Sequence, residues 1–268
     1  MNRVSEERVT STVTDGVADV RLTRPDKHNA LDPAMFIALD EAAAGLASRN
    51  DVRAVVLSGD GPSFCSGLDF AGMASGEIGI EDLLPAEPGE VANIFQRVAY
   101  AWQRLPMPTI AALQGACFGG GAQIALGADL RIAAPDTRIS IMEIRYGLVP
   151  DMGATQVLPM LVPLDVAKEL TFTGRIVEAS EAVELGLLTR IDGDPRTAAL
   201  ALAREIAAKS PHAIRAAKQL LNDAYRGRSE EVLALEAELQ RELIGSPNQV
   251  AAVTAAVTRQ PAEYADTD

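Results

Sequence analysis

Cysteine and histidine are scarce in this chain, with two of each among 268 residues. Cys65 and Cys117 lie far apart in the sequence and in no metal-ligand spacing, so we expect neither a disulfide framework nor a metal site. This cysteine usage is typical of a reducing, cytoplasmic compartment. His28 and His212 stand in unrelated contexts and no G-x-S-x-G motif is present, which argues against a Ser-His-Asp hydrolase.

Positive charge and long apolar segments are also lacking. The formal net charge is −13, whereas a nucleic-acid-binding protein needs a basic face that neutralises phosphates. The N-terminal ten residues are polar and carry no apolar signal segment. Residues 107–130 are almost uncharged, but Gln114, Gln123 and a glycine cluster interrupt them, which excludes a spanning helix. We therefore expect no nucleic-acid partner and no membrane partner.

Strand patterns alternate with helix patterns over the first two thirds of the chain. Asp15-Gly16 predicts a tight hairpin, and Asp32-Pro33 predicts a capped helix start. Alternation of this kind indicates parallel βαβ units and an α/β fold. The expected strands are Val9–Thr14, Val17–Leu22, Ala54–Leu57, Thr109–Leu113, Leu130–Ala133 and Ile139–Ile141, and the expected helices between them are Val91–Leu105 and Ala122–Leu126.

Beyond about residue 195 the sequence becomes continuously helical in pattern. The expected helices are Ala198–Lys209, Pro211–Tyr225, Glu230–Ile244 and Pro247–Thr258. We therefore predict an α/β core over residues 1–195 and a helical region over residues 196–268. The amphipathic C-terminal helices carry more apolar surface than one small core covers, which favours an oligomeric interface.

Two glycine-containing segments follow predicted strands. They are Ser63–Asp69, with the sequence SFCSGLD, and Gly115–Gln123, with the sequence GACFGGGAQ. Three consecutive glycines at a helix start leave bare N–H groups at the positive end of the helix dipole. Alternatively, these glycines only allow the helix to pack closely on the strand. The spacing differs from the G-x-G-x-x-G of a dinucleotide site.

Together the two segments resemble the paired oxyanion-hole loops of the crotonase (enoyl-CoA hydratase/isomerase) superfamily, F-x-[AS]-G-x-D and G-x-x-x-G-G-G. The resemblance extends to RPDKHNAL at residues 24–31 and to GLVPDMG at residues 147–153. It implies a crotonase-like spiral of ββα units over residues 1–195 and a C-terminal α-helical oligomerisation region. It further implies an acyl-CoA thioester substrate, no cofactor besides its CoA moiety, and a homotrimer or homohexamer.

By the same resemblance, the backbone N–H groups of Leu68 and Gly120 donate to the thioester oxygen. Two fixed donors stabilise the enolate that forms when a proton leaves the carbon next to the thioester, and losing one donor typically costs about 2.7–4 kcal/mol. We expect residues 71–89, including Met73, to form part of the pocket wall. The substrate- and CoA-binding residues implied are Lys27, Asn29, Ala30, Leu31, Ser66, Gly67, Asp69, Phe70, Gly119 and Gln123.

The carboxylates separate two reactions within the family. Glu143 matches one hydratase carboxylate, whereas Gln123 stands where many hydratases carry a second Glu. A Gln holds a water molecule but cannot accept its proton. Asp151 matches an acid of certain isomerases, and an isomerase needs one group at C2 and another further along the acyl chain. The pattern is most similar to the dienoyl-CoA isomerase branch, which usually has an Asp at the position of Gln123.

Three other interpretations stay open at this point. Glu143 is alternatively an ion-pair partner of Arg145 or Arg138, and Asp151 a cap of the helix expected near Gly153. Within the family, enoyl-CoA hydration with Glu143 as the main acid/base is the second hypothesis. A protein of another class, a non-catalytic acyl-CoA-binding or scaffold member of the fold, is the third.

Overall fold

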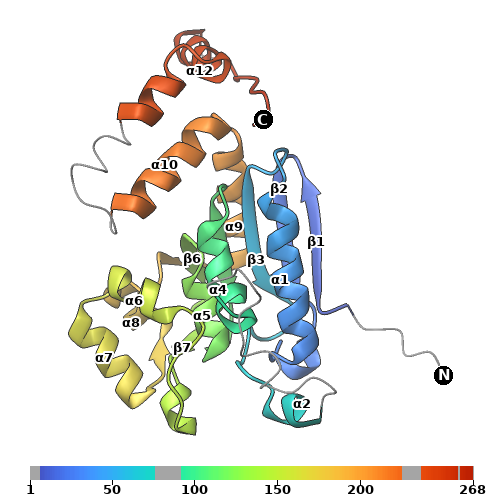
Figure 1. Cartoon of the computed structure of the whole chain (residues 1–268), viewed down its shortest axis with the longest axis vertical. Helices are drawn as coiled ribbons and strands as arrows, with labels where there is room; N and C mark the ends of the chain where they lie inside the picture. The colour runs from blue at the N-terminus through green and yellow to red at the C-terminus, as the bar shows by residue number, and fades with distance from the viewer. Residues whose placement is uncertain (1–6, 76–91, 225–236, 259, 268) are drawn as a thin grey trace, which may run out of the picture.

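A six-stranded sheet forms the centre of the computed structural model, which describes residues 7–75, 92–224, 237–258 and 260–267 (Figure 1). The strand order is β1-β2-β3-β4-β6-β9, and only the β1–β2 pair is antiparallel. Asp15 and Gly16 both adopt positive φ, which a tight hairpin turn requires. The strands are β1 (Val9–Thr14), β2 (Val17–Leu22), β3 (Ala54–Gly59), β4 (Thr109–Leu113), β6 (Leu130–Ala133) and β9 (Arg190–Ile191).

A smaller sheet of three strands lies beside the first, in the order β5-β7-β8. Its strands are β5 (Ala116–Phe118), β7 (Arg138–Ser140) and β8 (Val177–Glu178), with β5 and β7 parallel. β5 leads directly into α5, so this sheet places the second glycine segment. The sequence pattern located the β7 strand one residue late and did not reveal β5, β8 or β9, which are two or three residues long.

The helices begin close to the positions that the capping signals indicate. The Asp32 side chain accepts a hydrogen bond from the Met35 N–H at 2.8 Å, and Asn93 forms a capping box with Gln96. The helices are α1 (Pro33–Ala47), α2 (Phe70–Ser75), α4 (Ile94–Arg104), α5 (Gly120–Leu126), α6 (Ala154–Leu161), α7 (Leu164–Thr173), α8 (Ala179–Leu185), α9 (Pro195–Ala207), α10 (Pro211–Ala224) and α12 (Pro247–Thr258), with short 3-10 turns η1 (Pro25–Lys27) and η2 (Glu143–Tyr146).

Two predicted segments fall partly outside the described residues. Residues 237–243 are helical, whereas the first part of the expected helix Glu230–Ile244 lies outside the description. The expected pocket-wall segment 71–89 is described only to residue 75, and the side chain of Met73 lies outside the description. Among the helices that are described, none has the length and apolar character needed to cross a membrane.

The core has two parts, one on each face of the large sheet. On one face, α1, α4 and α5 bury apolar side chains against the strands, including Phe36 of α1 and Trp102 of α4. On the other face, α9 packs Ala199, Ala203 and Ala207 against residues of β2, β3, β4 and β6. The four-residue spacing of these alanines lets the helix approach the sheet closely.

The predicted boundary between core and helical region falls at the start of α9. The sequence pattern grouped α9 with the C-terminal helices because it shares their composition, whereas α9 packs on the large sheet. α10 and α12 extend away from the sheet (Figure 1). The division into residues 1–195 and 196–268 stays a prediction.

A buried ion pair fastens α10 to the core. Lys218 Nζ lies 2.7 Å from an Asp129 carboxylate oxygen and donates to the Met107 carbonyl at 3.0 Å. The same carboxylate oxygen accepts from the Thr109 N–H at 2.7 Å. Burial lowers the pKa of Lys218 and raises that of Asp129. Each charge therefore depends on the other for compensation.

Candidate active site

The two glycine segments lie against each other through backbone hydrogen bonds. Cys65 pairs with Cys117 in an isolated parallel bridge, and Leu31 pairs with Leu68 in another. The Leu31 N–H donates to the Gly67 carbonyl at 2.8 Å, and the Phe118 N–H donates to the Cys65 carbonyl at 3.0 Å. Three segments that are distant in sequence thus meet at one place.

The N–H groups of Leu68 and Gly120 make no hydrogen bond within the described ranges. Gly120 is the first residue of α5, where an N–H has no partner inside the helix. Gly119, which precedes it, has φ +52°, a conformation that L side chains rarely adopt. Two unpaired donors therefore stand at the junction of the segments.

Glycine is required here by the closeness of the two backbones. A Cβ on Gly67 would lie 2.8 Å from the Phe118 carbonyl oxygen, at a φ of +92°. A Cβ on Gly121 would lie 2.5 Å from the Cys65 carbonyl oxygen. Side chains at either position would push the two segments apart and separate the two donors.

A cavity of about 300 Å³ lies at this junction, and both Leu68 and Gly120 line it. Phe36 and Phe95 form part of its wall, with their rings edge to face at 4.7 Å. Phe70 and Tyr146, both exposed, also line it, with ring centroids 4.7 Å apart and ring planes tilted by 42°. Among the described residues, the lining consists of Leu31, Phe36, Ser66, Gly67, Leu68, Phe70, Phe95, Gly119, Gly120, Met142, Glu143, Tyr146, Leu148, Asp151 and Met152.

Glu143 begins η2 and lies buried in the wall of the cavity. Its Oε1 accepts a hydrogen bond from Gln123 Nε2 at 2.7 Å, whereas its Oε2 is buried without a hydrogen-bond partner among the described residues. Burial raises the pKa of this carboxyl above its ordinary value, and the charge of Asp151 adds to the rise. Neither Arg138 nor Arg145 forms an ion pair with it in the described part of the chain, so the structural alternative finds no support.

Asp151 lines the same cavity from the loop that precedes α6. The side chain is exposed, yet partial desolvation of its carboxyl raises the pKa. The N-cap of α6 is Gly153, which has no side-chain cap, so Asp151 does not cap this helix. Asp151 also borders an open groove of about 950 Å³ between α1 and α4. It therefore stands where the cavity meets the larger groove.

Gln123 lies behind the cavity wall and does not line the cavity. Its side chain is buried, and its Oε1 accepts from the N–H groups of Met152 at 2.9 Å and Ala154 at 3.2 Å. Its Nε2 donates to Glu143. The sequence pattern placed Gln123 among the substrate-binding residues, but these bonds join it to the protein instead.

Asn29 also supports the site from behind. Its side chain is fully buried, with Nδ2 donating to the carbonyls of Asp60 at 2.9 Å and Ser63 at 2.8 Å, and Oδ1 accepting from the Arg24 N–H at 2.8 Å. Asn29 has φ +54°, which Asn tolerates better than most residues. It joins the loop after β2 to the first glycine segment but does not reach the cavity.

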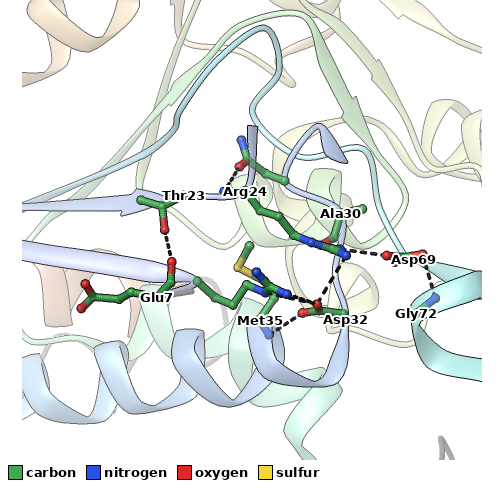
Figure 2. A network of polar contacts seen from close by, with 10 residues as sticks. Glu7, Thr23, Arg24, Ala30, Asp32, Met35, Asp69 and Gly72 are labelled. Atoms are coloured by element: carbon green, nitrogen blue, oxygen red, sulfur yellow. Dashed lines mark hydrogen bonds and ion pairs between the residues drawn. The ribbon is translucent and has the colours of Figure 1, made fainter. Parts of the chain in front are cut away.

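Arg24, which the sequence pattern did not single out, connects several predicted site residues (Figure 2). Its guanidinium donates to the Ala30 carbonyl at 3.0 Å and to an Asp69 carboxylate oxygen at 2.8 Å. It also lies 3.5 Å from the Asp32 carboxylate. The other Asp69 oxygen accepts from the Gly72 N–H, which together with Arg24 lowers the pKa of Asp69.

The remaining predicted residues divide into those at the cavity and those near it. Leu31, Ser66, Gly67, Phe70 and Gly119 line the cavity, whereas Lys27, Asn29, Ala30, Asp69 and Gln123 do not. Lys27 is exposed at the end of η1, and its carbonyl faces the Ser66 hydroxyl at 3.5 Å.

Several lining residues had no sequence signal. Phe95, Met142 and Tyr146 lie in no motif, and Leu148 and Met152 lie in the GLVPDMG segment but were not predicted as site residues. They reach the cavity only because α4, η2 and the following loop pack beside the glycine segments.

Nucleophilic catalysis by serine or cysteine finds no support in this geometry. Cys65 and Cys117 are free and buried, and burial raises the pKa of Cys65 to about 12. His28 Nδ1 lies 2.9 Å from the Ser63 hydroxyl, but Ser63 is buried and does not line the cavity. In the described ranges, no cluster of His, Cys, Asp and Glu is arranged to hold a metal ion.

The sequence profile of the enoyl-CoA hydratase/isomerase family matches residues 12–266. The chain belongs to this family, which confirms the predicted membership of the crotonase superfamily.

Among curated relatives, the mitochondrial Delta(3,5)-Delta(2,4)-dienoyl-CoA isomerase of Rattus norvegicus is 36% identical over 75% of this chain. The match covers 64% of the rat protein, so the chain spans less than two thirds of that relative. The short-chain-enoyl-CoA hydratase of Clostridium acetobutylicum is 30% identical and covers 92% of this chain and 93% of that protein. One relative is named as an isomerase and the other as a hydratase, which agrees with the prediction of an enzyme of one of these two kinds.

Solved structures confirm the predicted α/β crotonase fold. Enoyl-CoA hydratase from Bacillus anthracis has a TM-score of 0.88 at 27% identity, covering 96% of this chain and 98% of that one. Enoyl-CoA hydratase from Mycobacterium tuberculosis has a TM-score of 0.85 at 29% identity, covering 98% and 100%.

Proposed function

We propose that this protein isomerises a double bond of an unsaturated acyl-CoA through a thioester enolate. The supporting observation is that two unpaired N–H groups, of Leu68 and Gly120, and two carboxyl groups, of Glu143 and Asp151, line one cavity. The donors serve the oxygen on which negative charge develops, and the carboxyl groups serve the carbons that lose and gain a proton.

The proposed reaction conserves all atoms of the substrate. One carboxylate removes a proton from C2, and the electron pair moves onto the thioester oxygen between the N–H groups of Leu68 and Gly120. When the pair returns, the double bond forms at C2, and the other carboxyl group delivers a proton further along the chain. Water takes no part in either step.

Glu143 fits the role of the base. Its Oε2 is buried without a hydrogen-bond partner in the described residues, so the carboxylate is poorly solvated. Burial raises its pKa above the ordinary value, which makes the carboxylate a stronger base. Asp151 fits the distal role because it lies where the cavity opens into the larger groove.

Among the described residues no second buried carboxylate lies next to Glu143, which favours isomerisation over hydration. Gln123 occupies that place, and its amide oxygen is already bonded to Met152 and Ala154. It is therefore not available to orient a nucleophilic water, and an amide is not a base. Enoyl-CoA hydration by Glu143 is the second candidate, supported by the near full-length match to the Clostridium acetobutylicum hydratase.

The test compares the purified protein on crotonyl-CoA and on 3-enoyl- and 3,5-dienoyl-CoA esters. We expect double-bond migration to be faster than water addition, and the reverse order would support hydration instead. Glu143→Gln and Asp151→Asn are each expected to lower kcat by about 10²–10⁴-fold. Full activity in either variant would remove that residue from the mechanism. CoA-ester binding without turnover of any substrate would favour the non-catalytic interpretation.

We further propose a cytoplasmic homotrimer or homohexamer that requires no cofactor. Exposed apolar side chains on the C-terminal helical region, Leu221 on α10 and Val250 and Val253 on α12, support a subunit interface there. Light scattering after size-exclusion chromatography gives the mass. A monomer at micromolar concentration would contradict the proposed assembly.

A further inference from the structure

Gln123 stands between the two carboxylate-bearing segments and bonds to both. It comes from α5, the same helix whose first residue, Gly120, lines the cavity. Its Nε2 donates to Glu143 Oε1 at 2.7 Å, and its Oε1 accepts from Met152 N at 2.9 Å and Ala154 N at 3.2 Å. One buried amide therefore connects α5, η2 and the turn that carries Asp151.

We propose that Gln123 is a positioning residue that holds Glu143 with one carboxylate oxygen directed away from the amide and fixes the 151–154 turn beside it. This inference rests on the proposed isomerase function and deepens it. The direction of Glu143 follows from its two oxygens, because Oε1 is bound by Gln123 and Oε2 has no protein partner within the described residues.

The amide has chemistry that neither a carboxylate nor an apolar side chain supplies. It donates through nitrogen and accepts through oxygen at the same time, with no charge. A carboxylate at this position would accept from the two N–H groups but repel Glu143, whose Oε1 lies 2.7 Å from the present amide nitrogen. An apolar side chain would leave the N–H groups of Met152 and Ala154 and the Oε1 of Glu143 unpaired in a buried place.

The bond to Glu143 also affects its protonation. A donor to the ionised carboxylate stabilises it, so the bond from Gln123 lowers the pKa of Glu143 against the larger rise caused by burial. Asp151 is the charged group that acts on Glu143 from the adjacent loop. Arg145, which lies in η2 with Glu143, is exposed. Arg175 is paired with the Glu169 carboxylate at 2.7 Å. Loss of the Gln123 donor should therefore raise the pKa of Glu143.

The experiment compares the wild type with Gln123→Met, which keeps the length of the side chain but removes both hydrogen-bonding groups. We expect the acid limb of the kcat/KM profile to move upward by about one pH unit, which is a tenfold loss below the limb. The KM for the acyl-CoA should change much less than kcat, because Gln123 does not line the cavity.

Gln123→Glu provides a conservative rescue. Its protonated form has the same donor and acceptor arrangement as the amide, so activity should be retained in the pH range where the two facing carboxyl groups share one proton, and lost at higher pH when that proton leaves. Gln123→Met has no such range of recovery. If both variants show the wild-type pH profile, or if both lose activity equally at every pH, the positioning role is wrong.

A matched control is Gln114→Met. Gln114 Nε2 also donates to backbone carbonyls, those of Gly59 at 2.6 Å and Gly61 at 3.2 Å, but away from the cavity lining. We expect this variant to lose stability without moving the pH profile. A shift of the same size in Gln114→Met would show that the effect is a general loss of packing and would overturn the proposal.

Titration of the Glu143 side-chain carboxyl carbon by 13C NMR in the unliganded protein gives a readout independent of turnover, with Glu143→Gln assigning the signal. A raised pKa in Gln123→Met supports the positioning role even if the wild type proves inactive on enoyl-CoA esters, so failure of the proposed function and failure of this inference are distinguishable. An unchanged carboxyl pKa overturns the inference.

Discussion

Replacing Gly120 with alanine tests the oxyanion hole directly. The added Cβ would lie 2.7 Å from the Met152 sulfur and 2.8 Å from Leu31 Cδ1. Ordinary carbon contacts start at 3.4 Å, so either the neighbours or the backbone of residue 120 must move by about 0.7 Å. Movement of the backbone carries the N–H away from the position of the thioester oxygen.

The expected effect on catalysis is large and the effect on stability small. Complete loss of one oxyanion donor costs about 2.7–4 kcal/mol, or about 10²–10³-fold in kcat. Overpacking costs about 1–3 kcal/mol, but alanine gains about 1 kcal/mol over glycine in a helix, so the net loss of stability is at most about 2 kcal/mol. The flexible Met152 side chain reduces this loss further.

The assay measures kcat and KM with the best enoyl-CoA substrate, together with the unfolding midpoint. Gly45→Ala is the control, because Gly45 lies in α1 and a Cβ added there would meet no atom within 4 Å. This control should gain about 0.5–1 kcal/mol and keep full activity. A folded Gly120→Ala variant with wild-type kcat would show that the Met152 and Leu31 side chains move instead of the backbone, and would refute the predicted displacement of this N–H.

Three further predictions concern stability. The pKa of Glu143 is raised in the folded state, so its stabilising contribution is complete below the ordinary value of 4.5 and is lost as the pH rises through the folded-state pKa. Glu143→Gln should therefore have a higher melting temperature than the wild type at pH 8 and the same melting temperature at pH 4. Equal melting temperatures at both pH values would contradict this. Lys218→Met should lower the free energy of unfolding, measured in urea, by about 3–5 kcal/mol, because it leaves the Asp129 carboxylate without its ion-pair partner. The double variant Lys218→Met with Asp129→Asn should recover part of that loss. No recovery would show that loss of the ion pair is not the cause. Asn29→Ala should lose about 2–4 kcal/mol in the same assay, because it leaves one buried and two partly buried backbone groups unpaired, and a loss below about 1 kcal/mol would refute this role.

The β1–β2 hairpin and the start of α1 illustrate what local sequence predicts well. Both depend on residues within a few positions of each other, namely the Asp15-Gly16 turn and the Asp32 cap. The short strands β5, β8 and β9 were missed because two or three residues give too little periodicity to distinguish a strand from a loop. Their positions depend on partners elsewhere in the chain.

The role of Gln123 illustrates the opposite case. At the level of the sequence it is a polar residue at the start of a glycine-rich helix, and facing the substrate was the natural expectation. The fold brings the 152–154 turn and η2 to the same side of α5, and their unpaired groups bind both ends of the amide. Local sequence likewise did not show where α9 packs, because its alanine spacing suits packing on a sheet as well as on another helix.

The sequence by itself determined the two glycine segments, the strand before each, and the types of residue that carry charge near them. These features follow from backbone sterics and capping, which act over a few residues. Only the tertiary structure decided that Leu68 and Gly120 line one cavity, that Glu143 keeps one oxygen unpaired among the described residues, and that Asp151 stands beside the larger groove. Those outcomes depend on pairing and desolvation between segments far apart in the chain, and such contacts have no local signature.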